Sequence, residues 1–127
     1  MIKISCIFCN LSESRVELEN EYAIAIYDKY PVNEGHMLII PRRHYASYFQ
    51  ATEAEIMALN RLLTEARDHL DTNYNPAGYN IGVNINEAAG QTIMHLHIHL
   101  IPRYHGDIED PRGGIRKLKK ELVPYKG

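Results

Sequence analysis

Three histidines recur at every second position in the segment from His95 to Ile101, whose sequence is His-Leu-His-Ile-His-Leu-Ile. Side chains alternate between the two faces of a strand, so a strand here would place the three imidazoles on one face. The other face would be apolar and would pack into a core through Met94, Leu96, Ile98 and Leu100. Neutral imidazole is a nucleophile and a metal ligand, and its pKa of about 6.5 keeps these roles available near neutral pH. The row therefore predicts a reactive or metal-binding site in preference to a solvent-facing strand.

A second group of candidate ligands is Cys6-Ile7-Phe8-Cys9. Two thiolates separated by two residues suit one zinc ion, redox exchange or simple burial. The chain has only these two cysteines, so a zinc ion would need histidine ligands from elsewhere in the sequence. Redox exchange is the weaker alternative, because no β–α–β pattern of the thioredoxin type surrounds the pair.

Length and composition limit the classes of protein to consider. The chain has 127 residues and a mass of 14.6 kDa, the size of one domain. Apolar residues make up 45% and charged residues 24%, with a net charge of −2, so we expect a globular fold and not a partner of duplex nucleic acid or of a membrane. The first residues lack the basic and apolar regions of a signal peptide, which favours a cytoplasmic location.

The spacing of apolar residues predicts one main helix. Thr52 is a good N-cap, and Glu55 three residues later completes a capping box. An apolar stripe follows at spacings of three and four residues, on a helix of about 18 residues. Its members are Ile56, Leu59, Leu63, Ala66 and Leu70.

Short apolar runs on both sides of this helix predict strands. The expected extended segments are residues 16–27, 36–40, 79–84 and 93–101, separated by loops rich in Pro, Gly and Asn. Strands, one helix and further strands in this order favour an α+β fold with an antiparallel sheet.

The sequence resembles the histidine-triad (HIT) family, whose mark is His-φ-His-φ-His-φ-φ with φ apolar. The segment from His95 to Ile101 matches every position. The upstream matches are Gly90-Gln91-Thr92, Gly35-His36 before Leu38-Ile39-Ile40-Pro41, Asp28 eight residues before His36, and Asn84 eleven residues before His95. The resemblance covers about residues 4–105 of a single domain, 1–127, and leaves 106–127 as a variable tail. It implies a homodimer and a five-stranded antiparallel sheet with one main helix at about residues 53–71.

The family resemblance also implies an activity, which is cleavage of a purine nucleotide derivative at its α-phosphate. His97 matches the nucleophile that forms a covalent nucleotidyl-histidine, and His99 and His36 match donors to the phosphate oxygens. The remaining substrate positions are Gln91 and Thr92 as neutral donors, Asp28 for the ribose, Asn84, and Phe8, Leu11, Ile26 and Leu38 for the base. In sequence alone, the polar residues Asp28, Gln91 and Thr92 could also be loop residues, and the apolar ones could equally be plain core.

A branch of the family is similar to this sequence at the cysteines too. It pairs an N-terminal Cys-x-x-Cys with a histidine after a Pro-x-x-His turn and with the first histidine of the triad. The matching residues are Cys6, Cys9, His44 and His95, which implies a structural zinc ion with four protein ligands.

Two substrate classes fit the resemblance, dinucleoside polyphosphates and nucleoside phosphoramidates. The tail from Asp110 to Arg116 is similar to that of bacterial and archaeal HIT hydrolases labelled dinucleoside polyphosphate hydrolases, and Arg112 and Arg116 could contact phosphates. A polyphosphate could carry Mg²⁺ with it. The alternatives are a nucleotidyltransferase with a phosphate acceptor and a nucleotide-binding interaction protein without catalysis.

Overall fold

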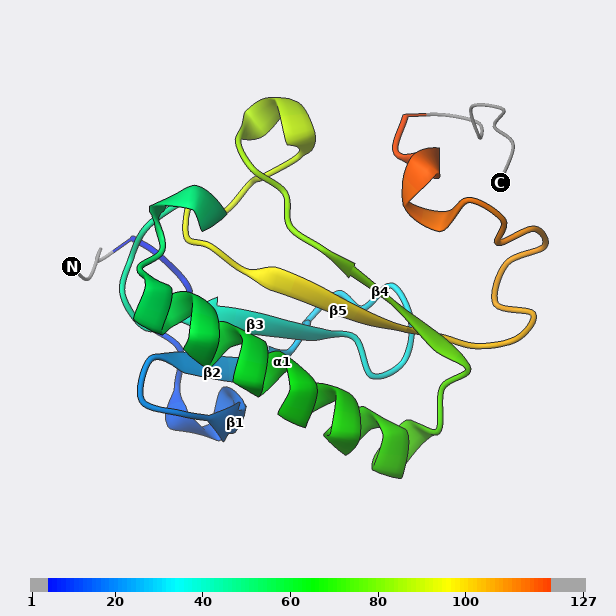
Figure 1. Cartoon of the computed structure of the whole chain (residues 1–127), viewed down its shortest axis with the longest axis horizontal. Helices are drawn as coiled ribbons and strands as arrows, with labels where there is room; N and C mark the ends of the chain where they lie inside the picture. Colours follow the sequence, from blue (N-terminus) through cyan, green and yellow to red (C-terminus); the bar gives the residue numbers. More distant parts are fainter. Residues whose placement is uncertain (1–4, 120–127) are drawn as a thin grey trace.

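The computed structural model describes residues 5–119. Residues 1–4 and 120–127, including the end of the predicted tail, lie outside the described residues. Among the described residues, five strands form one sheet and one long helix packs on it (Figure 1). The bounds are β1 (Val16–Glu19), β2 (Ala23–Tyr27), β3 (Met37–Pro41), α1 (Glu53–Tyr74), β4 (Gly78–Gly82) and β5 (Ile98–Arg103).

The sheet has the strand order β1-β2-β3-β5-β4, and each neighbouring pair is antiparallel. The prediction of an α+β fold with a five-stranded antiparallel sheet and one main helix is therefore confirmed. In the pairing of the central strands, Leu38 lies opposite His99 and Ile39 lies opposite Ile98. The β3–β5 pair brings the histidine segment next to residues some sixty positions earlier in the chain.

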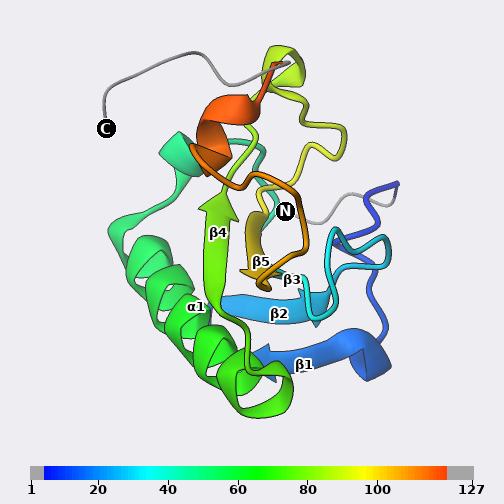
Figure 2. The same cartoon turned by 90° about the vertical axis from the view of Figure 1, so that its right-hand side faces the viewer.

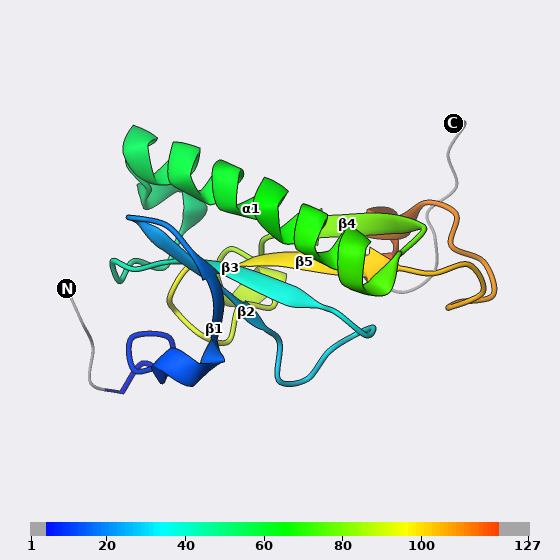
Figure 3. The same ribbon diagram turned by 90° about the horizontal axis from the view of Figure 1, so that it is seen from below.

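Both faces of the central strands are apolar, and two different parts of the chain cover them. Because side chains alternate, Met37 and Ile39 of β3 face α1 while Leu38 and Ile40 face the other way. Figure 3 shows α1 on one side of the sheet and the N-terminal segment, in blue, on the opposite side. The second face is covered there by Phe8, which packs into the same buried cluster as Leu38.

Helix α1 begins as predicted. The Thr52 hydroxyl accepts from the amide of Glu55, and the Glu55 carboxylate accepts from the amide of Thr52. The helix continues to Tyr74, beyond the predicted end near residue 71, and closes at Asn75 in the left-handed conformation. Within residues 5–119, no helix combines the length and apolar character needed to cross a membrane.

The buried stripe of α1 differs in part from the predicted one. Leu62, which the prediction left out, is fully buried, whereas Ile56 and Leu63 lie at the margin. Spacings of three and four residues fit two neighbouring stripes on a helix, so the sheet decides which one is covered. The buried residues of the helix are Glu55, Ala58, Leu59, Leu62, Ala66 and Leu70.

Two predicted strands have different limits in the structure. Residues 16–27 form two strands and not one extended segment, because the Asn20 carboxamide oxygen accepts from the amides of Tyr22 and Ala23 and so holds a turn. β5 begins only at Ile98, so His95 and His97 precede the strand. Met94 is 43% exposed and does not join the core, although Leu96, Ile98 and Leu100 do.

After β5 the chain runs beside the edge strand β4 (Figure 2). A short turn of helix at Gly114–Lys117 lies against β4, where the Cβ position of Gly82 is 3.9 Å from the Ile115 side chain. Arg112 is exposed and pairs with the neighbouring Asp110. The described part of the tail, up to residue 119, therefore reaches the β4 edge of the sheet.

Glu55 ties the start of α1 to the turn that follows β3. Its side chain is only 5% exposed and accepts from the guanidinium of Arg43 at 2.7 and 3.0 Å. These hydrogen bonds are the main reason that the pKa of Glu55 lies below its ordinary value of 4.5. Arg43 also stacks on the ring of Tyr45, 4.2 Å from its centroid, so the whole turn is braced.

We expect Glu55→Gln to lower the free energy of unfolding by about 1–2 kcal/mol, because it removes a hydrogen-bonded ion pair but keeps a capping side chain. A lowered folded-state pKa stabilises the protein above the unfolded-state pKa, and this stabilisation is lost as the pH falls through the folded-state pKa. Urea unfolding should therefore show the difference between variant and wild type at pH 7 and its disappearance in acid. Glu53→Gln, an exposed change in the same helical turn, is the control; a difference that persists unchanged below pH 3 would contradict this account.

Candidate functional site

A pocket of about 410 Å³ lies on the sheet face opposite α1. It brings together most of the residues predicted to contact substrate, although they come from five separate parts of the chain. The predicted residues that line it are Phe8, Leu11, Ile26, Asp28, Leu38, Asn84, Thr92, His97 and His99. His36 and Gln91 lie behind this lining and are almost fully buried.

The pocket also contains residues that the sequence reasoning missed. Four of them, Ile7, Lys29, Gly90 and Ile93, are direct neighbours of predicted residues, so their presence could have been inferred from adjacency. Arg15 gave no signal in the sequence, and it enters because its guanidinium donates to the backbone oxygen of Tyr27 at 3.2 Å. The full set of additional lining residues is Ile7, Arg15, Lys29, Tyr30, Gly90 and Ile93.

The ring of His97 is held in one orientation by the backbone. Its Nδ1 lies 2.8 Å from the carbonyl oxygen of His95, an acceptor only, so Nδ1 carries the proton and donates. In the neutral ring, Nε2 then has a free electron pair. Phe8 packs edge-on against this ring with the centroids 5.1 Å apart. His97 thus has the tautomer that a nucleophilic imidazole needs.

His36 and His99 form a directed chain of hydrogen bonds. The amide of Val32 donates to Nδ1 of His36 at 3.0 Å, so the proton of the neutral His36 ring is on Nε2. That Nε2 lies 3.0 Å from Nδ1 of His99 and 3.4 Å from a carboxylate oxygen of Asp28. If His36 donates to His99, the proton of neutral His99 is on Nε2. This nitrogen is then a donor for a bound ligand.

Burial sets the charge of these rings. It lowers the pKa of His36 and of His95, and it lowers that of His99 to about 4 with help from charge on His97 and His36. A neighbouring carboxylate, Asp28, opposes the effect on His36 and His99 but does not overcome it. Near neutral pH these rings are therefore uncharged hydrogen-bonding groups.

The turn before β3 places His36 under the pocket. Gly35 has a φ of +93°, and a Cβ there would lie 3.3 Å from side-chain atoms of Leu70, Tyr74 and Pro102. A larger residue would therefore be both strained and crowded. This close fit holds the start of β3 against the end of α1. A backbone hydrogen bond also holds His36, because the amide of Asp28 donates to the carbonyl of His36 at 2.8 Å.

Gln91 supports the loop before the histidines. Its amide nitrogen donates to the carbonyls of Ala46 and Ile93 at 2.9 and 3.1 Å, and its amide oxygen accepts from the backbone of Asn86 at 2.8 Å. The sequence predicted a donor to phosphate at this position. The structure instead places Gln91 as a brace for the chain that carries Thr92 into the pocket.

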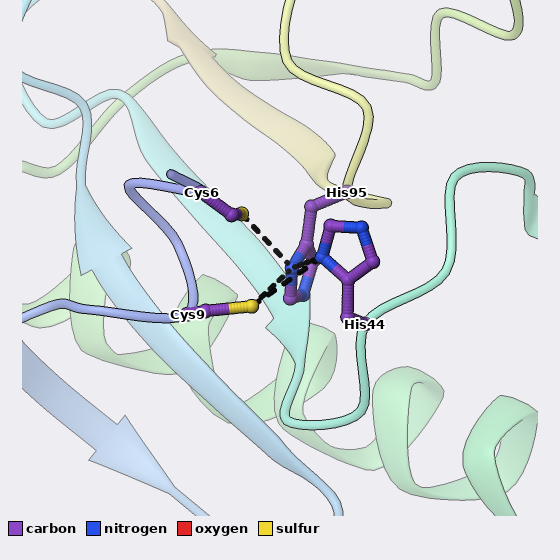
Figure 4. Close-up of side chains that lie close together, drawn as sticks. All are labelled: Cys6, Cys9, His44 and His95. Atoms are coloured by element: carbon purple, nitrogen blue, oxygen red, sulfur yellow. Dashed lines mark hydrogen bonds between the residues drawn. The ribbon is translucent and has the colours of Figure 1, made fainter. Parts of the chain in front are cut away.

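Four side chains converge on one point, as Figure 4 shows. Cys6 and Cys9 come from the N-terminal segment, His44 from the turn after β3, and His95 from the chain before β5. The Sγ atoms of Cys6 and Cys9 lie 3.5 and 3.6 Å from Nδ1 of His95. Nδ1 of His44 lies 3.3 Å from Sγ of Cys9 and 3.1 Å from Nδ1 of His95.

This cluster has the geometry and the electron pairs of a metal centre. Around a tetrahedral zinc ion, nitrogen ligands would be about 3.3 Å apart and nitrogen and sulfur ligands about 3.5 Å apart, close to the spacings found here. His95 points Nε2 at the carbonyl oxygen of Pro41, 2.8 Å away, so Nε2 carries its proton and Nδ1 has a free electron pair for a cation. These four residues could hold a metal ion.

The polar atoms of Asp28, His36 and His99 are equally close to one another, but their electron pairs do not suit a metal ion. There, Nδ1 of His36 already accepts a backbone hydrogen bond, so its Nε2 presents a proton and not an electron pair. A metal ion at this place would require His36 to lose that bond. The group is better explained as a set of hydrogen bonds.

Comparison with known proteins identifies one family. The HIT domain model matches residues 11–106. An uncharacterized 16.1 kDa HIT-like protein from Mycoplasma pneumoniae is 37% identical over 108 residues, which cover 82% of this chain and 75% of that protein. The AP-4-A phosphorylase of Mycobacterium tuberculosis is 30% identical over 96 residues, which cover 75% of this chain and 49% of that protein.

Solved structures show the same fold. A HIT family protein from Bacillus anthracis has a TM-score of 0.76 and 32% identity, covering 82% of this chain and 77% of its own. A zinc-bound histidine triad family protein from Mycobacterium smegmatis has a TM-score of 0.73 and 26% identity, covering 91% of each. Plasmodium falciparum diadenosine triphosphate hydrolase has a TM-score of 0.73 and 26% identity, covering 79% of this chain and 68% of its own.

We expect the purified protein to bind one divalent metal ion per chain at the four-residue cluster. His44→Ala and Cys9→Ser should each reduce the bound metal at least tenfold, because a three-ligand site loses much of its affinity. Elemental analysis of the dialysed proteins measures this directly. His105→Ala, which removes an exposed histidine outside the cluster, should keep the full metal content; equal loss in that variant would argue against the assignment.

Proposed function

The chain belongs to the HIT domain family, and on this basis we propose that it is a nucleotide hydrolase that cleaves a purine nucleotide derivative at its α-phosphate. The single observation that carries the proposal is the hydrogen bond from Nδ1 of His97 to the carbonyl of His95, at 2.8 Å. It leaves Nε2 of His97 as a nucleophile in a pocket that has both apolar walls and hydrogen-bond donors.

In the first step, Nε2 of His97 attacks the α-phosphorus. The P–Nε2 bond forms, and the bond from phosphorus to the leaving group breaks, with its electron pair departing on that group. The ring keeps its Nδ1 proton and so becomes a cation in the nucleotidyl intermediate. The carbonyl of His95 accepts from this proton and stabilises the charge that develops on the ring.

In the second step, water attacks the same phosphorus. The P–Nε2 bond breaks, its electron pair returns to Nε2, and the surplus proton of the water passes to solvent. A nucleoside monophosphate and neutral His97 remain. Dividing one displacement into two lowers the barrier of each step, and His99 with Thr92 donates hydrogen bonds to the phosphate oxygens in both.

The rest of the pocket fits a nucleoside. Phe8, Leu11, Ile26 and Leu38 form an apolar wall for the base. The Asp28 carboxylate accepts from the amide of Tyr30 at 2.8 Å, which orients it toward the pocket as an acceptor for ribose hydroxyls. Asn84 lines the same pocket, where it can contact the phosphates or the leaving group.

We further assign the metal at Cys6, Cys9, His44 and His95 as a structural zinc ion. Zinc with four protein ligands supplies cross-linking and no open coordination position. Residues of about 4–105 are the catalytic unit of the single domain and the tail is its variable part. The dinucleoside polyphosphate and phosphoramidate classes both remain substrates to test, and the active form is a cytoplasmic homodimer.

His97→Ala should abolish turnover, with a loss of at least about 10³-fold in kcat, while binding of AMP stays within a few-fold of wild type. Short incubations with diadenosine polyphosphate or adenosine phosphoramidate, followed by intact-protein mass spectrometry, should show an added adenylyl mass in wild type but not in His97→Ala. His105→Ala serves as the matched control and should retain both. An adduct or turnover that survives in His97→Ala would reject His97 as the nucleophile.

Asp28→Asn should weaken AMP binding about 10- to 100-fold, since charge-assisted hydrogen bonds to the ribose are lost. The same change should have a much smaller effect on 2′,3′-dideoxy-AMP, which lacks both hydroxyls. Calorimetric titration of wild type and Asp28→Asn, each with AMP and with 2′,3′-dideoxy-AMP, gives the coupling energy between the Asp28 carboxylate and the ribose hydroxyls. Equal losses for the two ligands would show that Asp28 acts elsewhere than on the ribose.

The relative named AP-4-A phosphorylase favours a second candidate function, in which phosphate replaces water as the acceptor. Attack by inorganic phosphate on the nucleotidyl-histidine would release a nucleoside diphosphate and restore His97. We expect hydrolysis to dominate, so AMP should be the product from diadenosine polyphosphate with or without phosphate. Production of ADP that depends on added phosphate, and incorporates it when labelled, would favour the transfer reaction.

A further inference from the structure

The metal cluster and the candidate nucleotide pocket share one short piece of chain. Ile7 and Phe8 lie between the two cysteines, and both line the pocket. The segment has no helix or strand between Ser5 and Ser12. Its position on the sheet depends on the packing of Phe8 and Leu11 and on the contacts of Cys6 and Cys9 with His44 and His95.

Phe8 contacts both centres directly. Its ring is edge-on to that of His95, with the centroids 6.0 Å apart, and edge-on to that of His97, at 5.1 Å. It is 8% exposed and packs with Ile26 and Leu38, the floor of the pocket. One aromatic ring therefore lies against a metal ligand, against the proposed nucleophile and against the base wall.

We propose that metal binding at Cys6, Cys9, His44 and His95 is coupled to nucleotide binding through Phe8, which acts as a positioning residue, so that each ligand tightens the binding of the other. The inference rests on the proposed function, because it assumes that the pocket takes a nucleotide.

The physical reason is a shared ordering cost. A nucleotide base needs Ile7 and Phe8 held against the sheet, and Ile7, which is 58% exposed, would become covered by the base. A metal ion that fixes Cys6 and Cys9 fixes these two residues as well. Whichever ligand binds first orders the segment, so the second binds without that cost. Thermodynamic linkage requires the two affinities to change by the same factor.

The experiment measures both affinities of the full-length protein. Zinc affinity is measured by competition with a chromogenic chelator, with and without saturating AMP. AMP affinity is measured by calorimetry on the zinc-loaded and the zinc-free protein. We expect AMP to tighten zinc binding, and zinc to tighten AMP binding, by the same factor of at least about fivefold.

Two phenylalanine variants test the route of the coupling. Phe8→Ala keeps all four metal ligands and should reduce the factor to less than about twofold. Phe49→Ala changes the other phenylalanine of the chain, which is 82% exposed, and should keep the wild-type factor. Cobalt substitution, read by its thiolate absorption, shows that the centre still forms. If Phe8→Ala does not load metal, Phe8→Leu replaces it and should show a reduced factor.

The outcomes separate this inference from the proposed function. AMP that binds the zinc-loaded protein while zinc affinity stays the same overturns the coupling and leaves the nucleotide function standing. An unchanged factor in Phe8→Ala overturns the role of Phe8. AMP that fails to bind the zinc-loaded protein overturns the proposed function and this inference with it.

Discussion

His95 is fully buried, and its two ring nitrogens and its backbone oxygen face different partners. Nε2 donates to the carbonyl of Pro41 at the end of β3, and the backbone oxygen of His95 accepts from Nδ1 of His97. Nδ1 faces Cys6, Cys9 and His44. The bond to Pro41 decides which nitrogen of His95 offers an electron pair to the cluster, and the backbone oxygen decides which nitrogen of His97 offers one to the pocket. A change in the placement of His95 would thus disturb both centres at once.

The two faces of the sheet are covered differently, and this difference explains what a metal ion at the four-residue cluster could stabilise. Helix α1 covers one face with 22 residues of regular backbone hydrogen bonding. The opposite face must stay partly open, because it forms the pocket, and it is covered at one side by an irregular segment that includes Phe8. A segment without a backbone ladder gains little from its own hydrogen bonds, so side-chain ties must hold it. Metal ligation by Cys6, Cys9, His44 and His95 would provide such ties, and the free energy of metal binding would then add to that of folding.

The features that depend only on residues close together in the sequence could be predicted from the sequence. The capping box of Thr52 and Glu55 and the alternation of Leu96, Ile98 and Leu100 need only neighbours in sequence, and the structure agrees with both. The pairing of β5 with β3 begins only at Ile98, opposite Ile39, although β3 continues to Pro41, so the alternating pattern overestimated the strand. The geometry of the metal cluster joins Cys6 to His95 across 89 positions, and it was expected only through the family resemblance. The role of Gln91 could not be predicted from its residue type, because a side-chain amide can bind a phosphate or backbone groups equally well.

The charge state of the pocket has a consequence for how a nucleotide would be held. The buried rings of His36 and His99 are neutral near pH 7, with the pKa of His99 at about 4, so the fixed cations in the lining are Arg15 and Lys29, opposed by Asp28. A permanent charge on His99 would lie 5.2 Å from the ring of His97, measured between centroids, and would oppose the cation that would form there in the proposed attack. Burial of His36 and His99 would therefore favour a cationic intermediate on His97, because it keeps the neighbouring rings uncharged.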